Sequence, residues 1–179
     1  MTSSDELLEL VYNALCAFGA TAAGDRVRRP GDLPTQADQY PILKLRLTAE
    51  NRQSLGRGGV QFITLATIRV TGEVSEPAIF NDPDLSPAEA ALWDLKREIE
   101  TAIINSYPLF QVVQQLVSVQ SQLAFTAQAT HLAGIQSDYT FEFYEGPENF
   151  ARLPVADLTE VDVVDPLHPP VRFRAALIP

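Results

Sequence analysis

A stretch of thirty-seven residues without Asp, Glu, Lys or Arg, from Thr101 to Ser137, is the feature that most limits what this chain can fold into. A charge-free run of this length is typical of a membrane span, but seven glutamines are scattered through it. Amide side chains find no hydrogen-bond partners in lipid, so we expect no membrane contact. The stretch must instead be buried in a fold or covered by a protein partner.

Within this stretch, apolar and polar residues alternate from Val117 to Gln128, which is the period-two pattern of a β-strand. Aromatic residues alternate again from Tyr139 to Tyr144 and predict a partner strand, with a turn or bulge at Ala133-Gly134 between the two. The outer face of the first strand is polar but uncharged. Its residues are Ser118, Gln120, Gln122, Thr126 and Gln128.

The remaining elements follow from local signals. Ser3 and Glu6 have the spacing of a capping box and open an amphipathic helix. Ser86 with Pro87 opens a second helix, which should end before Pro108. Between the helices, alternation over residues 40–48 and 62–74 predicts a long hairpin with a glycine-rich tip.

This order of elements defines the expected fold class. Hairpins dominate over crossover connections, so we predict an α+β fold: a mainly antiparallel β-sheet with two helices packed on one face and an extended C-terminal arm. A chain of 179 residues fits a single domain, 1–179, in which residues 146–179 form an extended Pro-rich segment.

No constellation of residues indicates catalysis. The single cysteine, Cys16, excludes an internal disulfide and a cysteine-based zinc site. The glycines at 56–59 lead into a strand, whereas a phosphate-binding loop leads into a helix. We therefore expect no enzyme, no catalytic or metal-binding residue and no cofactor. An enzyme or ligand-binding domain would have to rest on His131, His168 and scattered carboxylates.

The uncharged strand face indicates an interface. Exposed strands normally carry charges, which keep sheets from pairing wrongly, whereas subunit interfaces deplete charge at their centre. Simple exposure to solvent is the alternative interpretation of this face. At the glycine-rich tip, arginines are placed to bind a partner's carboxylates. The expected subunit or tube interface comprises Arg52, Arg57, Gly58, Ser118, Gln120, Gln122, Thr126 and Gln128.

Charge is unevenly distributed along the chain. The net charge of -10 and the pI near 4.5 disfavour a protein that binds nucleic acid by neutralising phosphates. From Arg26 to Thr71, however, eight basic residues face three acidic ones. Complementary patches of this kind are used by head-to-tail rings, so the segregation is consistent with oligomerisation.

In the order and local character of its elements the chain resembles the tail terminator, or tail completion, proteins of tailed bacteriophages. The resemblance extends over most of the chain and lies in pattern more than in individual residues. Its pieces are the opening helix at 4–18, the segment Gln39-Tyr40-Pro41-Ile42-Leu43-Lys44-Leu45-Arg46-Leu47, the strand Phe62 to Val74, the helix from Ser86 to Tyr107-Pro108-Leu109-Phe110, and the strand Tyr139 to Tyr144.

The resemblance implies a structural virion protein of the tail-neck region, assembled in the cytoplasm of a bacterial host. Such proteins form a homo-oligomeric ring, typically hexameric, that caps the tail tube, ends its polymerisation and presents the surface for head-tail joining. The implied partners are the tail tube protein and head-tail connector proteins. DNA would pass through the ring without specific binding, repelled by carboxylates.

Another virion part is the alternative within the same class: a head-tail connector, neck or baseplate subunit of a phage or phage-like particle. The Pro-rich end from Pro147 to Pro179 departs from the more compact members of the family. It leaves open a different tail type or an arm that exchanges a strand with a neighbouring copy.

Overall fold

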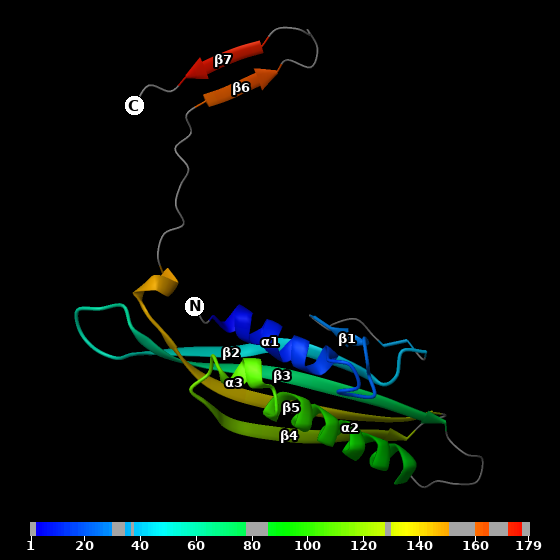
Figure 1. Cartoon of the computed structure of the whole chain (residues 1–179). Coiled ribbons are helices and arrows are strands. Elements are labelled where there is room, and N and C mark those ends of the chain that lie inside the picture. The colour runs from blue at the N-terminus through cyan, green and yellow to red at the C-terminus, as the bar shows by residue number, and fades with distance from the viewer. Residues whose placement is uncertain are drawn as a thin grey trace.

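The computed structural model describes residues 3–29, 35–36, 38–77, 86–127, 130–150, 160–164 and 172–176. Its centre is a five-stranded sheet in the order β1-β2-β3-β5-β4 (Figure 1). All neighbouring strands are antiparallel except β1, which pairs parallel to β2. The strands are β1 (Val27–Arg28), β2 (Ile42–Ser54), β3 (Phe62–Pro77), β4 (Gln115–Ala127) and β5 (Thr130–Glu145).

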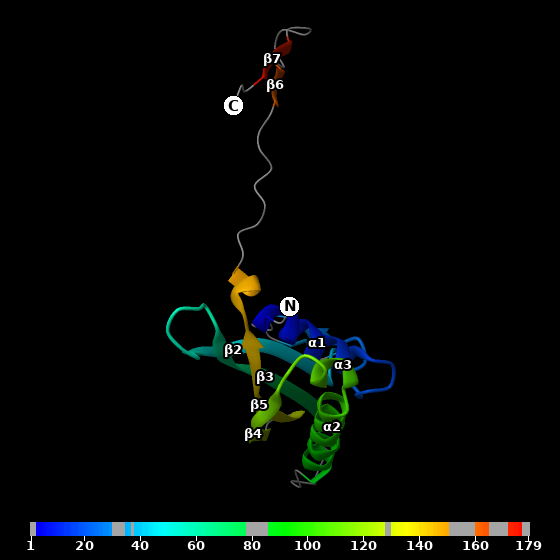
Figure 2. The ribbon, with the colours of Figure 1, turned by 60° about the vertical axis from the view of Figure 1, so that its left-hand side comes forward.

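Helices cover one face of this sheet. The helix α1 (Ser4–Cys16) packs on β1 and β2, and α2 (Ser86–Ile104) packs on β3 and β5. A short helix, α3 (Tyr107–Phe110), follows α2 and contacts α1. Figures 1 and 2 show the helices on the same side of the sheet. The predicted α+β class, with a mainly antiparallel sheet and helices on one face, is therefore confirmed.

Both long helices begin and end near the predicted residues. The Ser3 side chain caps α1 by accepting a hydrogen bond from the backbone N–H of Glu6 at 3.2 Å. Asp5 and Glu6 in the first turn complement the positive end of the helix dipole. The helix α2 ends at Ile104, and Pro108 lies in the first turn of α3.

The core lies between the helices and alternate residues of the two central strands. On β3 the inward residues include Ile68 and Val70, and on β5 they include Tyr139, Phe141 and Phe143, all fully buried. They meet the apolar stripes of α1 and α2, as period-two and period-3.6 patterns require. This alternation leaves the opposite face of the sheet without a helix.

The predicted turn or bulge at Ala133-Gly134 is wrong, because the pairing register does not shift at these residues. Both residues lie inside β5, where Gly134 pairs with Glu73 on β3 and with Ala124 on β4. Glycine favours turns locally, but here the pairing of β5 with strands on both sides fixes an extended backbone. The connection between β4 and β5 lies earlier in the chain, between Ala127 and Thr130.

The predicted C-terminal arm, residues 146–179, is only partly described. A 3-10 helix, η1 (Pro147–Phe150), follows β5. The strands β6 (Glu160–Val164) and β7 (Arg172–Ala176) pair with each other as a separate antiparallel sheet. The other residues of the predicted arm, 151–159, 165–171 and 177–179, lie outside the described residues.

Candidate protein interface

The strand β4 forms one edge of the sheet, and its outer margin pairs with no other described strand. None of its thirteen residues is charged. Gln120 and Gln122 are exposed and Ser118 is half-buried, on the face that the helices leave uncovered. Their cross-strand neighbours on β5 are Asp138, Gln136 and Thr140. The structure thus brings these three predicted interface residues together on an uncovered polar face.

The alternation along β4 is interrupted, contrary to the sequence prediction. The register with β5 shifts between Leu116 and Ser118, which is the signature of a β-bulge at Val117. As a result Val117 is 46% exposed, and Val119, on the helix side of the sheet edge, is 37% exposed. From Ser118 onward the pairing is regular, so two apolar side chains accompany the amides at an accessible strand edge.

The rest of the uncovered face carries charges that pair across strands. Lys44 on β2 donates to Glu73 on β3 at 2.7 Å. Arg69 on β3 donates two hydrogen bonds to Asp138 on β5, at 2.7 and 2.8 Å. In these pairs the charges in the middle of the face neutralise one another within one chain. The uncharged margin of the sheet is confined to β4.

The two long margins of the sheet differ in charge. Beyond the short β1, the outer edge belongs to β2, which carries Arg46, Glu50 and Arg52 along its length. Charged side chains are the usual means of keeping an edge strand from pairing with another chain. The β4 edge has no such protection, so the two edges are built for different surroundings.

The tip of the β2–β3 hairpin, residues 55–61, projects from one end of the sheet (Figure 1). Gly58 has a φ of 96°, a value that favours glycine, and the backbone N–H of Leu55 donates to the carbonyl of Gln61 at 3.0 Å. Arg57 is exposed and forms no ion pair with any described residue. Leu55 and Val60 are 52% and 50% exposed. The tip therefore presents two aliphatic side chains together with a cation.

Arg52, in contrast, is used inside the chain. Its Nε donates to Glu145 Oε2 at 2.7 Å, its Nη1 pairs with Glu50, and its guanidinium lies over the Phe150 ring at 5.8 Å. Thr64 also donates to Glu145. Burial by itself would raise the pKa of Glu145, but the hydrogen bonds from Arg52 and Thr64, with the positive charge of Arg52, hold this pKa below its ordinary value.

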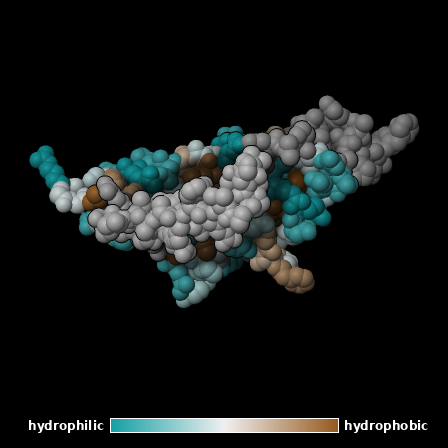
Figure 3. All heavy atoms as spheres, turned by 90° about the horizontal axis from the view of Figure 1, so that it is seen from above, coloured by the Kyte–Doolittle hydropathy of each residue, from teal (hydrophilic) through white to brown (hydrophobic). Residues whose placement is uncertain are grey.

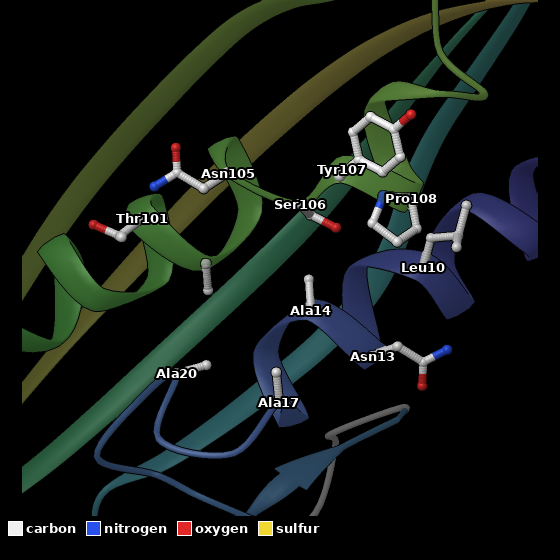
Figure 4. Close-up of a pocket in the computed structure, with 11 residues that line it drawn as sticks. Leu10, Asn13, Ala14, Ala17, Ala20, Thr101, Asn105, Ser106, Tyr107 and Pro108 are labelled. Carbon is white, nitrogen blue, oxygen red and sulfur yellow. The ribbon is translucent and has the colours of Figure 1, made fainter.

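A groove opens on the outer side of the helix layer. It has a volume of about 570 Å³ and lies between α1 and the end of α2 with α3 (Figure 4). Leu10 and Ala14 line it from α1, Ala17 lines it directly after that helix, and Tyr107 and Pro108 line it from α3. None of its lining residues is charged. Tyr107 is 73% exposed, so the groove is an accessible apolar surface.

Other predicted residues are placed only in part. Thr126 lies in β4, but its side chain is outside the described part of the structure, as is all of Gln128. His131 lies in β5 and His168 outside the described residues. Among the residues described, no group of three or more His, Cys, Asp or Glu is arranged to hold a metal ion. Nor does any described helix have the length and apolar character needed to span a membrane.

Sequence reasoning missed the groove and the apolar part of the tip. Leu55 and Val60 stand out on inspection, because they are aliphatic residues beside three glycines in a predicted turn. The groove had no such signal, since its lining comes from helices separated by about eighty residues of chain. No protein-family model matches this chain, and a search of curated proteins finds no match.

Proposed function

We propose that this protein is a structural subunit that assembles as a ring on the end of a bacteriophage tail tube, as the tail terminator proteins it resembles do. The ring ends tube polymerisation and offers the surface to which head-tail connector proteins join. No catalysis and no cofactor take part. The place of action is the tail-neck region of the virion, after assembly in the bacterial cytoplasm.

The observation that carries this proposal is the β4 edge. It is thirteen residues long and uncharged, and it includes the exposed side chains of Val117 and Val119, while the β2 edge of the same sheet is charged. A long unprotected edge strand is a template for pairing with another chain. A protein that retains one must have it covered in its working state, by a sister copy or by a tube subunit.

The mechanism is geometric. A sister copy or the last tube ring hydrogen-bonds the free backbone groups of β4, and the amides of Gln120 and Gln122 supply donors and acceptors without a desolvated charge. Once covered, the edge cannot accept a further tube subunit. The acidic excess of the chain, with its net charge of -10, keeps the ring from retaining the DNA that passes through it.

A charge-placement experiment tests the proposal. In the double variant Gln120→Lys/Gln122→Lys, two cations enter the β4 margin, so the capping of tail tubes should be lost in negative stain. The matched control is Asn51→Lys/Gln53→Lys, which adds the same charge to exposed positions of the already charged β2 edge. Tubes that are capped equally well by both variants would contradict the proposal.

A further inference from the structure

Two apolar surfaces of the chain are left uncovered in places far apart, one of them a projection and the other a hollow. One is a projection, the hairpin tip with Leu55 and Val60. The other is a hollow, the groove between α1 and α3 (Figure 4). Exposed apolar patches of this kind mark sites of protein association.

The backbone at the base of the tip is fixed by the sheet. The β2–β3 ladder runs without a break from Ala49↔Thr67 to Ser54↔Phe62, directly at the base of the tip. The hydrogen bond from Leu55 to Gln61 adds one further link. Seen from above, this narrow end of the molecule carries strongly hydrophobic and strongly hydrophilic atoms side by side (Figure 3). A base fixed in this way limits the conformational entropy that the chain loses there on binding.

The groove has the room and the character to receive these side chains. Its volume of about 570 Å³ is within the range of protein binding pockets. Ala14, Ala17 and Ala102 form small, apolar walls, and the Tyr107 ring and Pro108 close the side toward α3. Aliphatic side chains entering here would leave water without burying any unpaired charge.

The charge beside the groove is opposite in sign to the charge of the tip. Glu6 lies one turn before Leu10 on α1, at the i, i+4 spacing that places both on the same helix face. Neither Glu6 nor Asp5 forms an ion pair with a described residue, and both are exposed. Arg57, between Leu55 and Val60 in the chain, is the corresponding exposed cation of the tip and pairs with no carboxylate in the described part of the chain. The tip thus combines two aliphatic side chains with a cation, and the groove combines an apolar lining with a nearby carboxylate.

The tip cannot reach the groove of its own chain. Figures 1 and 2 both show it projecting from the end of the sheet, away from α1 and α3, and the continuous ladder keeps it there. The occupant must therefore come from a second copy. Because tip and groove are different surfaces, the contact is head-to-tail, which closes into a ring when the rotation allows.

We propose that Leu55 and Val60 of one copy insert into the α1–α3 groove of the next copy, with Arg57 facing Glu6. The inference rests on the proposed function, because the contact of tip and groove is the one that joins sister copies of the proposed ring. It leaves the β4 edge free for the tail tube.

Complementation between two variants tests the contact. Leu55→Asp/Val60→Asp removes the apolar tip and keeps the groove, while Ala14→Trp fills the groove and keeps the tip. Each variant alone should be monomeric by light scattering, with circular dichroism like the wild type. An equimolar mixture should form particles of twice the 19.7 kDa chain mass and no larger, because only one tip and one groove remain intact. Variants that assemble like the wild type, or a folded mixture that stays monomeric, would overturn the inference.

A disulfide trap serves as the second measurement, should either variant fail to fold. In a Cys16→Ser chain, Val60→Cys and Ala14→Cys should oxidise to a ladder of covalent multimers, whereas Val60→Cys alone should not. A chain carrying both cysteines that stays monomeric would refute the contact.

Rings that cap tubes despite an altered tip would leave the proposed function standing without this contact. Tip-dependent rings that do not cap tubes would sustain the contact and refute the proposed function.

Discussion

Arg52 and Glu145 are ninety-three positions apart in the chain, yet the guanidinium donates two hydrogen bonds to the carboxylate, at 2.7 and 3.3 Å. Glu145 is only 2% exposed, and its remaining partner is the hydroxyl of Thr64. The pair ties β2, β3 and β5 together at the end of the sheet from which the hairpin tip projects.

Replacing Glu145 with Gln should lower the free energy of unfolding by about 1–3 kcal/mol, because it removes a hydrogen-bonded charge and leaves Arg52 without its main partner. Urea denaturation measures this loss. The control is Asp94→Asn, which breaks a pair with Arg97 whose side chains are 69% and 77% exposed and should cost less than about 0.5 kcal/mol. Equal effects of the two changes would show that the buried pair is not stabilising.

The same carboxylate should give stability a dependence on acid. Its pKa lies below the ordinary value in the folded chain, so on acidification the unfolded chain takes up the proton first. The contribution is complete above about pH 5, where an ordinary Glu is ionised, and is lost as the pH falls through the lowered pKa. The stability difference between wild type and Glu145→Gln should therefore shrink from pH 7 to pH 3. A difference that stays constant over this range would contradict the assignment.

Gly72 is required for packing between the sheet and α2. A Cβ at this position would lie 3.1 Å from both Ile135 Cγ2 and Leu95 Cδ2, and 3.3 Å from Leu43 Cδ2. Gly72→Ala should therefore destabilise the fold by about 1–3 kcal/mol through overpacking, measured by thermal or urea unfolding.

Gly59→Ala is the matched control, because an added Cβ there meets only Gln61 Cγ, at 4.0 Å. Its effect should stay within about 0.5 kcal/mol. If Gly72→Ala were as stable as this control, the packing of α2 against β3 would not require a glycine at position 72.

Tyr139 is fully buried, and its hydroxyl has no hydrogen-bond partner among the described residues. Tyr139→Phe keeps the ring in the core and removes an unpaired polar group, so stability should stay the same or rise by about 1 kcal/mol. Differential scanning calorimetry measures the change. A loss of more than about 1 kcal/mol would reveal a hydrogen bond that the hydroxyl makes in solution.

Much of the fold follows from local sequence signals, and the exceptions have a common cause. The Ser3 cap and the alternation in β3 were predictable because capping and burial period are encoded within a few residues. The bulge at Val117 and the extended backbone at Gly134 were not, because pairing with other strands decides both. A register shift is a property of two strands and leaves no mark in either alone.

The candidate interface divides in the same way. The uncharged face of Ser118, Gln120 and Gln122 was predictable from alternation, and the structure leaves that face uncovered by helices. For Arg52, composition indicated an exposed cation at a hairpin, whereas the fold supplies Glu145 from a distant strand. Pairing across such a separation depends on strand order, which periodicity does not fix.

Amide hydrogen exchange of the β4 edge tests the central claim most directly. Peptides covering residues 115–124 should become protected when the protein assembles with tail tubes, because another chain then occupies the free backbone groups of β4. Peptides covering the charged β2 edge, residues 45–53, serve as the internal control and should exchange as in the free chain. Unchanged exchange of 115–124 in capped tubes would contradict the claim that the β4 edge is covered by a partner.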